Sequence, residues 1–554
     1  MQGIRTFDSP RTKFIAAVYS QNVAIRRGFA GYHNTNGGTM HALDVSDQTT
    51  APETPPRRRT YAGQLMIWLL LLALVMMPFS ATALTPLEDA VSTFTYTQNM
   101  HPIGYSERAV PLDNTVPGQS LINSDLAFWG TTAYQGSYVG FRIIDISDPE
   151  NPVEILDYED CSPGSTVGNQ GDVIVWGNVL VRSWNSNTPA AGATCDGDVV
   201  PPGFEGLHVF DVSNPLDPDL VASVDLAQGS HTATGVPDLA NNRLLIYNSS
   251  SSGANPGIDI VEVPLSAPEN AAFLRFEPAG RSCHDTGVIL GDVMRVACAG
   301  GNGFTVWSLD PADGASLVDP VQLYSRTVTG VTIGHSASFS WDGGILIFGH
   351  EPGGGTQARC QATSSIVDRS LFFFETETGD LLGTFVHPRP QTNLENCTWH
   401  NYNVVPTNKR HILVSGNYQS GVSVIEFTDP TNVYEIGFAD PAPLVDPNPP
   451  VGIETGGDWS TYWYNGLIYE SDITRGVIIW NLSDNTVAGA MRFDHLNPQT
   501  QETSFPFKGT AFGRSKPADQ LGFVIFGESA SDDASGGAGS DEGFAGDGDG
   551  FGGP

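Results

Sequence analysis

The chain has 554 residues, with 61 acidic and 26 basic side chains and a formal net charge of -35 at pH 7. Such a charge repels phosphate backbones and anionic lipid headgroups, which argues against nucleic-acid binding and against membrane docking through a basic patch. Charged residues make up only 16% of this acidic protein, and its 62 glycines and 38 prolines predict many turns between short strands.

The N-terminal part has the pattern of a secretory signal peptide. Three arginines precede the apolar run Leu65–Met77, and small residues at 81–83 have the spacing of a cleavage site. We expect residues 57–83 to be the signal peptide and residues 1–56 to be a disordered leader or the product of a mis-assigned start. An uncleaved membrane anchor is the alternative, although the apolar run is shorter than the roughly 20 residues that span a bilayer. Only that segment would then contact a membrane.

The six cysteines all follow the expected cleavage site, at positions 161, 195, 283, 298, 360 and 397. An even number in an exported chain favours disulfides, although six cysteines allow 15 connectivities. Cys283 and Cys298 lie almost symmetrically about residues 291–292, as two residues that face each other across a hairpin do. The simplest remaining pairs are Cys161 with Cys195 and Cys360 with Cys397. The signal and the cysteines together predict a secreted, periplasmic or cell-surface protein.

Seven segments of the chain resemble one another. Each begins with Gly or Ser, continues with five or six residues rich in Val, Ile and Phe, and usually ends in an Asp-Pro or Asn-Pro turn. They are GFRIIDISDPENP from Gly140, GLHVFDVSNPLDP from Gly206, GIDIVEVPLSAPEN from Gly257, GFTVWSLDP from Gly303, SLFFFETETG from Ser370, GVSVIEFTDPTN from Gly421 and GVIIWNLSDN from Gly476. Such repetition predicts a repeat architecture.

A pair of short strands around a tight turn precedes these segments. The turns include Asp342-Gly343 and Asn465-Gly466, dipeptides that are typical of hairpins. A hairpin, the repeated strand and one further strand make four strands per repeat. Seven such units, without a helical pattern between them, predict an all-β fold: a seven-bladed β-propeller of four-stranded antiparallel blades over residues 84–527. A β-helix is the alternative, but its rungs would be shorter and more regular.

Two of the repeats, GFRIIDISDPENPV and GLHVFDVSNPLDP, resemble the LVIVD repeat of exported bacterial and archaeal β-propellers. The segments SCHDTGV, GHSASFSWDGG, NCTWHNYNVVP and WSTYWYNGLIYESD are similar to internal stretches of a secreted subgroup of that family. The resemblance covers about residues 120–490 and implies the propeller fold. It implies no particular reaction, because the family has no single assigned activity. Repeats five and seven lack the Asp-Pro turn, so their outer strands are the weakest part of the prediction.

The end of the chain has a different composition. Residues 528–554 are nearly free of large apolar side chains and predict a disordered acidic tail.

One position in the first strand of each hairpin is expected to line the central channel. Counted back from the hairpin turns, these positions are Asn123, Gln170, His231, His284, His335, His400 and Trp459. Because equivalent positions on successive blades form a ring, four consecutive blades would offer one imidazole each. Clustered neutral imidazoles suit transition metals, so the histidines are candidate ligands of a Cu or Zn ion. A wet, polar channel lining would also explain them without any ligand.

Other residues give weaker signals. His350 and Glu351 follow the second strand of the His335 blade and could reach the same channel mouth. The remaining histidines of the mature chain share no register, so we expect them on the surface or in turns: His101, His208, His387, His411 and His495. The aspartates of the Asp-Pro turns are expected to form turns rather than paired catalytic carboxylates.

The sequence leaves two functions open. The chain has no nucleophile elbow, zinc-protease helix, phosphate-binding loop or dinucleotide fingerprint. The leading interpretation is an extracytoplasmic binding or interaction scaffold, with an unknown protein or small molecule at one face of the propeller. The alternative is a metal-dependent, oxidoreductase-like enzyme of the copper or zinc type, with its metal on the channel histidines.

Overall fold

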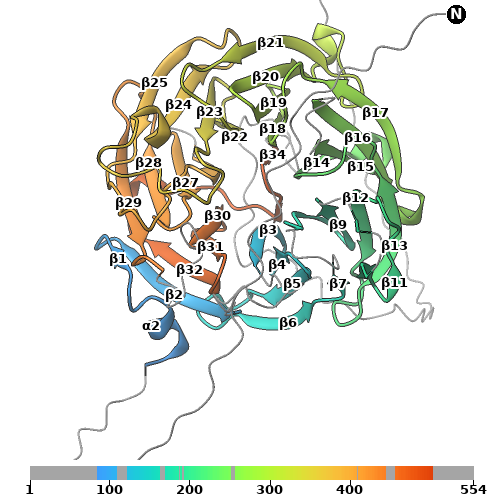
Figure 1. Cartoon of the computed structure of the whole chain (residues 1–554), viewed down its shortest axis with the longest axis horizontal. Helices are drawn as coiled ribbons and strands as arrows, with labels where there is room; N and C mark the ends of the chain where they lie inside the picture. The colour runs from blue at the N-terminus through green and yellow to red at the C-terminus, as the bar shows by residue number, and fades with distance from the viewer. Residues whose placement is uncertain are drawn as a thin grey trace, which may run out of the picture. The chain divides into compact units, whose positions relative to one another are not determined.

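The computed structural model describes residues 84–108, 122–162, 169–185, 188–189, 192–250, 256–407, 410–444 and 456–502. Within these residues the chain forms a ring of seven antiparallel sheets, preceded by the short helix α2 (Pro86–Ala90) (Figure 1). The predicted seven-bladed β-propeller is confirmed. The expected leader, signal peptide and acidic tail lie outside the described residues, and no described helix is long and apolar enough to cross a membrane.

The first four blades each follow one another along the chain. From the channel outward, the first blade consists of β3 (Asn123–Trp129), β4 (Thr132–Ser137), β5 (Gly140–Asp145) and β6 (Val153–Tyr158), and the second of β8 (Val173–Trp176), β9 (Val179–Trp184), β12 (Gly206–Asp211) and β13 (Asp219–Asp225). The third blade consists of β14 (Ala233–Asp238), β15 (Arg243–Ser249), β16 (Gly257–Pro264) and β17 (Ala272–Pro278). The fourth consists of β18 (Asp285–Leu290), β19 (Arg295–Gly300), β20 (Gly303–Ser308) and β21 (Val321–Thr327).

The last three blades complete the ring. The fifth blade consists of β22 (Gly334–Phe339), β23 (Ile345–His350), β24 (Ser370–Glu375) and β25 (Leu381–Val386). The sixth consists of β26 (Asn401–Val405), β27 (Ile412–Gly416), β28 (Val422–Glu426) and β29 (Tyr434–Asp440). The seventh consists of β30 (Asp458–Tyr464), β31 (Leu467–Asp472), β32 (Gly476–Leu482) and β2 (Met100–Glu107). Short additions to these sheets are β1 (Thr95–Tyr96), β33 (His495–Leu496) and β34 (Thr500–Glu502), and a separate sheet contains β7 (Cys161–Ser162), β10 (Thr194–Cys195) and β11 (Asp198–Val199).

The seven repeated segments form the third strand of each blade, from β5 to β32. Their Val, Ile and Phe side chains pack between neighbouring blades, which favours β-branched and aromatic residues. The aspartate at the end of the strand then starts the turn. The Oδ1 atoms of Asp145 and Asp211 each accept the backbone N–H two residues later at 2.8 Å and form Asx turns. In the Asp-Pro turns, Asp310 and Asp429 accept the N–H two residues later at 2.8 and 3.0 Å, so these aspartates form turns as expected.

The predicted hairpin turns join the first and second strands. Asn465 and Gly466 have φ values of 53° and 100°, the left-handed conformation that a tight hairpin turn requires. At the other predicted turn, the Asp342 carboxylate accepts the N–H of Gly344 at 3.0 Å. The turn chemistry of the sequence therefore sets where each inner strand ends.

The core lies between the faces of adjacent blades. All six residues of β9 are buried, because the blades on both sides cover it. Four fully buried tryptophans fill the wider spaces: Trp184, Trp307, Trp399 and Trp480. Strands that are buried on both faces read as apolar runs rather than as alternating patterns, which matches the repeated segments.

Ring closure corrects the assignment of the last blade. Among the described residues, no outer strand of this blade follows β32; instead β2, from the N-terminal part, pairs antiparallel with β32 as the outer strand. This pairing joins the two ends of the propeller and covers a sheet edge that would otherwise be open. The fifth blade, whose outer strand was equally weakly predicted, has its own outer strand, β25.

The three predicted disulfides are confirmed. Cys283 pairs with Cys298 across the β18–β19 hairpin, and Cys161–Cys195 and Cys360–Cys397 close separations of 34 and 37 residues. None of the six cysteines is free. Disulfides persist in oxidising compartments, so the covalent structure fits a protein that lies outside the cytoplasm.

Candidate functional site: a row of histidines at the channel mouth

The predicted ring positions all lie near the start of an inner strand. Asn123 begins β3, and Trp459 is the second residue of β30. The inner strands of a propeller all run in the same direction along the channel axis, so their first residues lie at the same mouth of the channel. The four histidines occupy this position in blades three to six: His231, His284, His335 and His400.

The structure brings the four imidazoles into one contiguous row. The ring centroids of His231 and His284 are 4.0 Å apart, those of His284 and His335 are 4.0 Å apart, and those of His335 and His400 are 4.1 Å apart. The side chain of His284 is 22% exposed, whereas His335 and His400 are each 2% exposed. The row therefore runs from a solvent-accessible end into the protein.

Three of the histidines are oriented by oxygen acceptors at Nδ1. His284 Nδ1 lies 3.1 Å from Asp285 Oδ1, His335 Nδ1 lies 3.1 Å from the carbonyl oxygen of His400, and His400 Nδ1 lies 2.5 Å from the carbonyl oxygen of Trp459. Carboxylates and carbonyls only accept, so at His284 and His400 Nδ1 carries the proton and Nε2 keeps a lone pair. At His335 the hydroxyl of Ser336 also lies 2.5 Å from Nδ1. Metal-ligating histidines use the same arrangement, in which the nitrogen that does not bind the metal donates to a carboxylate or a carbonyl.

His231 begins the row through a different contact. Its Nδ1 lies 2.7 Å from the amide Nδ2 of Asn185, and its Nε2 lies 2.7 Å from Nε2 of His284. Without an ion, these contacts form a hydrogen-bonded chain from Asn185 through both histidines to Asp285. Two nitrogens bound at about 2.0–2.1 Å to one tetrahedral ion would be about 3.3 Å apart, so the two rings would have to separate slightly to share an ion.

Two groups of side chains in the row could hold a metal ion. One consists of His284, Asp285 and His335, and the other of His335, Glu351 and His400; within each group the potential ligand atoms lie within 4.8 Å of one another. Glu351 directly follows β23, so it lies at the mouth as the sequence suggested. His350 points elsewhere, with its ring nitrogens near Thr332 and Val367.

Burial and charge determine protonation in the row. Burial, with the neighbouring imidazoles, holds the pKa of His335 well below its ordinary value, and burial lowers the pKa of His400 to about 4. Burial also lowers the pKa of His284, but Asp285, by its hydrogen bond and its charge, and Glu351, by its charge, outweigh this effect and raise it. Neutral imidazoles, the form that binds metals, are therefore favoured at His335 and His400.

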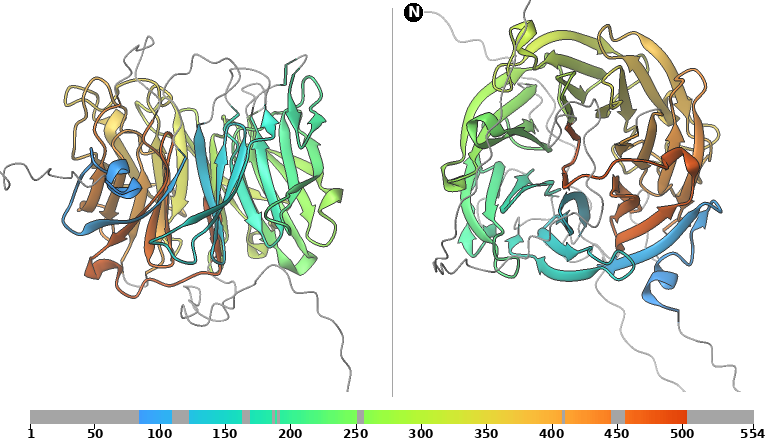
Figure 2. Two further views of the ribbon diagram at one scale, coloured as in Figure 1. Left: turned by 90° about the horizontal axis from the view of Figure 1, so that it is seen from below. Right: turned by 180° about the vertical axis from the view of Figure 1, so that it is seen from behind.

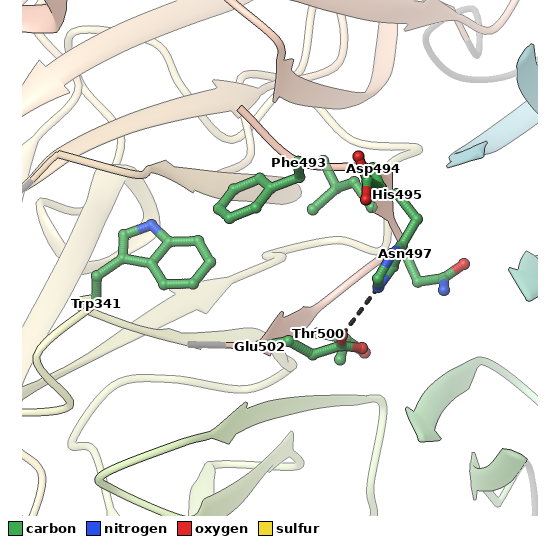
Figure 3. A pocket seen from close by; sticks show the side chains of 8 residues that line it. Trp341, Phe493, Asp494, His495, Asn497, Thr500 and Glu502 are labelled. Atoms are coloured by element: carbon green, nitrogen blue, oxygen red, sulfur yellow. Dashed lines mark hydrogen bonds and ion pairs between the residues drawn. The ribbon is translucent and has the colours of Figure 1, made fainter. Parts of the chain in front are cut away.

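The opposite end of the channel is occupied by the C-terminal segment (Phe493–Glu502). It crosses from the rim into the centre of the ring (Figure 2, right), where β33 pairs with the last residues of β3 and β34 pairs with the end of β18. A pocket of about 20 Å³ between this segment and Trp341 has room for about one water molecule (Figure 3). The row of histidines is therefore reached from the other mouth.

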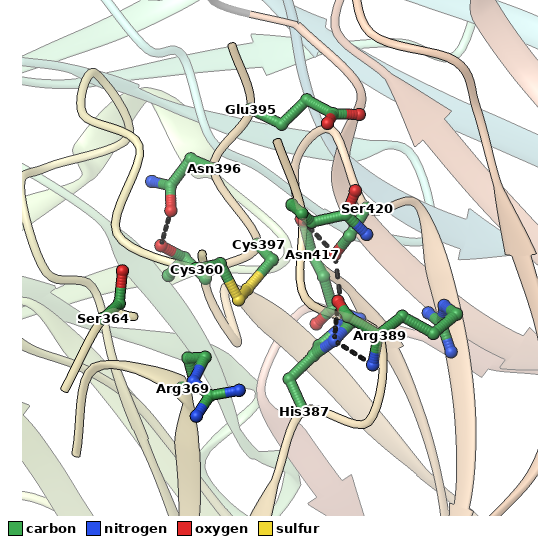
Figure 4. Close-up of a disulfide and its surroundings, with 12 residues drawn as sticks. Cys360, Ser364, Arg369, His387, Arg389, Glu395, Asn396, Cys397, Asn417 and Ser420 are labelled. Atoms are coloured by element: carbon green, nitrogen blue, oxygen red, sulfur yellow. Dashed lines mark hydrogen bonds between the residues drawn. A yellow bond between two sulfur atoms is a disulfide. The ribbon is translucent and has the colours of Figure 1, made fainter. Parts of the chain in front are cut away.

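The expectation that the remaining histidines lie on the surface or in turns is wrong for three of them. His208 is 1% exposed and stacks on Phe204, and His387 is 1% exposed beside the Cys360–Cys397 disulfide (Figure 4). His495 lies between Trp129 and Trp176 within the C-terminal segment. Isolated histidines carry no periodic signal, so the sequence could not show that aromatic neighbours cover them.

His208 and His387 each lie close to two cysteines. Those cysteines are joined in disulfides and hence supply no thiolate to a metal. The row at the channel mouth is accordingly the stronger candidate site within the described chain.

Sequence reasoning missed two residues of the site. Tyr418 packs against His400, with ring centroids 4.2 Å apart, and Asn185 orients His231. Both belong to loops that follow second strands rather than to the inner strands. The ring positions Asn123 and Gln170 carry no imidazole, and Trp459 contributes its carbonyl oxygen to His400.

Comparison with known proteins supports the repeat assignment. The model of the LVIVD repeat matches residues 124–160 and 203–226, which cover the first blade and the outer half of the second. No curated protein matches the chain. Similar solved structures include the computationally designed Ika8 protein, at 12% identity, 68% coverage of this chain, 100% of that chain and a TM-score of 0.37. The β-propeller domain of Myceliophteria thermophila Cps50 (Swd1) has 11% identity, the same coverages and a TM-score of 0.40.

Likenesses at this level carry no argument about activity. The two matched segments are those in which the sequence resembled the LVIVD repeat, and they lie in blades of the observed ring. The chain is therefore a seven-bladed β-propeller that carries LVIVD repeats.

Proposed function

We propose that this protein is an exported β-propeller that binds one transition-metal ion at its channel mouth, within the row formed by His231, His284, His335 and His400. The observation that carries the proposal is the orientation of the imidazoles. Three consecutive rings, those of His284, His335 and His400, have an oxygen at Nδ1, and their centroids lie 4.0 and 4.1 Å apart along the row. A channel lining without a ligand does not require this uniform orientation.

The charges around the row support a divalent cation. Asp285 and Glu351 are both buried, and no described lysine or arginine pairs with either of them. Burying carboxylates without a compensating charge costs several kcal/mol, and the histidines that face these two carboxylates supply a charge only when they are protonated. Two carboxylates beside a divalent ion with neutral imidazole ligands would bring the net charge of the site close to zero.

The geometry also supports a catalytic use of the ion. A catalytic site keeps a position open for water or substrate, whereas a structural site is closed by protein ligands. The exposed end of the row, at His231 and His284, leaves such an approach from the channel mouth. Copper- or zinc-dependent, oxidoreductase-like chemistry at this mouth is therefore the function that we assign, in an extracytoplasmic compartment consistent with the three disulfides.

Elemental analysis of the full chain tests the proposal. The protein would be produced in a host that forms disulfides and purified without chelator, together with His335→Ala and, as a control, His101→Ala, whose histidine is exposed on β2. We expect about one equivalent of transition metal in the wild type and in the control, and its loss from folded His335→Ala. A wild type that is metal-free and takes up none on reconstitution would refute the proposal.

A scaffold function is the second candidate, and one observation favours it. Large apolar side chains are exposed on the outer strands of three consecutive blades: Phe273 and Leu274, Val321 and Leu323, and Leu381 and Leu382. Exposed apolar patches mark interaction sites. If this rim binds a protein partner, Leu381→Lys should abolish its capture while leaving the metal content unchanged; capture that survives the substitution would exclude this rim.

A further inference from the structure

Glu351 approaches the histidine row from the side and is almost completely buried, with 5% of its surface exposed. The hydroxyl of Tyr418 donates a hydrogen bond to Oε1 at 2.9 Å. The other carboxylate oxygen, Oε2, lies 4.0 Å from Nε2 of His335 and accepts no hydrogen bond from a described residue. One oxygen is thus fixed by the protein, and the other is directed at the nitrogens that would hold the ion.

The separation of these atoms fits two ligands of one ion. A carboxylate oxygen and an imidazole nitrogen that share an ion at about 2.0–2.2 Å lie about 3–4 Å apart, depending on the angle between the bonds. A distance of 4.0 Å is too long for a direct hydrogen bond. His335 itself therefore stabilises the Glu351 carboxylate little. A cation between the two side chains would balance the negative charge of Glu351.

Tyr418 is held in a conformation that keeps its hydroxyl at Glu351. Its φ is 49°, in the left-handed region that non-glycine residues rarely adopt. Backbone hydrogen bonds of 2.9 and 2.8 Å to and from Asp458 hold it there. Gly355 approaches so closely that a Cβ on it would lie 2.9 Å from the Tyr418 hydroxyl oxygen. Such strain costs about 1–3 kcal/mol and persists where the surroundings impose it, often at functional sites.

We propose that Glu351 is a carboxylate ligand of the metal ion and that Tyr418 is the residue that positions it. This inference rests on the proposed function and adds to it a carboxylate ligand and the class of metal. Two imidazoles with one carboxylate, the set formed by His335, Glu351 and His400, is the donor set of non-haem iron(II) sites and also occurs in catalytic zinc sites. The carboxylate therefore favours zinc or iron(II) over copper.

Titration with Co²⁺ tests the assignment, because the visible bands of Co²⁺ report its ligands. The full chain, Glu351→Gln, Glu351→Asp and Tyr418→Phe would be compared after removal of bound metal. The matched control is Glu470→Gln, which alters another fully buried glutamate whose carboxylate accepts a hydrogen bond from Trp480 at 2.7 Å. Circular dichroism would establish that each variant is folded.

We expect Glu351→Gln to raise the Kd for Co²⁺ at least about 10-fold and to shift the visible bands, with partial recovery in Glu351→Asp. Tyr418→Phe should raise the Kd about 10-fold, and Glu470→Gln should change neither property. If the wild type binds Co²⁺ and Glu351→Gln binds it with the same Kd and spectrum, Glu351 is not a ligand although the histidine site stands. A wild type that binds no Co²⁺, Zn²⁺ or Fe²⁺ overturns both. Should Glu351→Gln fail to fold, an unchanged Kd in Tyr418→Phe would overturn the positioning role.

Discussion

Replacing Asn497 by alanine tests whether the C-terminal segment holds the inner strands together. The Asn497 side chain accepts the backbone N–H of Val175 at 2.8 Å and donates to the carbonyl of Val175 at 2.9 Å, so it takes the place of a neighbouring strand beside β8. Asn497 is 3% exposed and Val175 is fully buried, so water cannot replace the lost partners without a rearrangement.

Each unpaired buried group costs about 1–3 kcal/mol, so Asn497→Ala should lower the free energy of unfolding by about 2–5 kcal/mol. Denaturant titration followed by tryptophan fluorescence and circular dichroism would measure the change, provided that both probes give one coincident transition. Asn151→Ala is the control, because Asn151 is exposed and its side chain donates to the carboxylate of the nearby, exposed Asp148. A loss below about 1 kcal/mol relative to this control would show that the segment is not an integral part of the ring.

Three further predictions follow from burial and topology. Burial and the charge of Arg182 lower the pKa of His208 to about 3. Between about pH 6.5 and pH 3, His208 is therefore protonated in the unfolded chain but not in the folded chain, which favours unfolding. The wild type should lose more stability than His208→Phe as the pH falls from 6.5 toward 4, and parallel pH profiles of the denaturation midpoint would contradict this. Replacing both Cys283 and Cys298 by alanine opens a separation of 15 residues and should cost about 3 kcal/mol; an unchanged midpoint would contradict it. A chain that lacks residues 84–108 should aggregate, because β32 would lose β2; a monomeric, folded product in light scattering would show that the ring closes without this strand.

Local patterns predicted the repeated part of the fold well. The third strands and their Asx turns are determined by neighbouring residues, and hairpin turns such as Asn465-Gly466 favour a single backbone geometry. The disulfide between Cys283 and Cys298 follows in the same way from another hairpin, that of β18 and β19. These features depend on contacts that are close in sequence, which is why composition and spacing suffice to predict them.

Long-range pairings were beyond such reasoning. The strand β2 (Met100–Glu107) contains proline and glycine and has no counterpart in the repeats, so only ring closure explains its place. The C-terminal segment is largely polar, and its side-chain amides replace backbone partners: Gln501 bonds to both the N–H and the carbonyl of Phe339. No hydrophobic period marks a segment that is stabilised in this way.

The candidate site was predicted in part. The register of the hairpins identified the four histidines, because one position per blade returns to the same mouth. Tyr418 and Asn185 could not be identified, since each lies in a loop whose path depends on the blade next to it. Their contacts with His400 and His231 exist only in the assembled ring.

The most direct test of the central claim is the anomalous diffraction of crystals grown from the full chain and loaded with Zn²⁺ or Fe²⁺, collected at the absorption edge of the metal. The account predicts one strong peak within about 2.0–2.2 Å of Nε2 of His335, Nε2 of His400 and Oε2 of Glu351. The contradicting result is a map without a peak at the row, in which Asn185, His231, His284 and Asp285 keep their metal-free hydrogen-bonded chain.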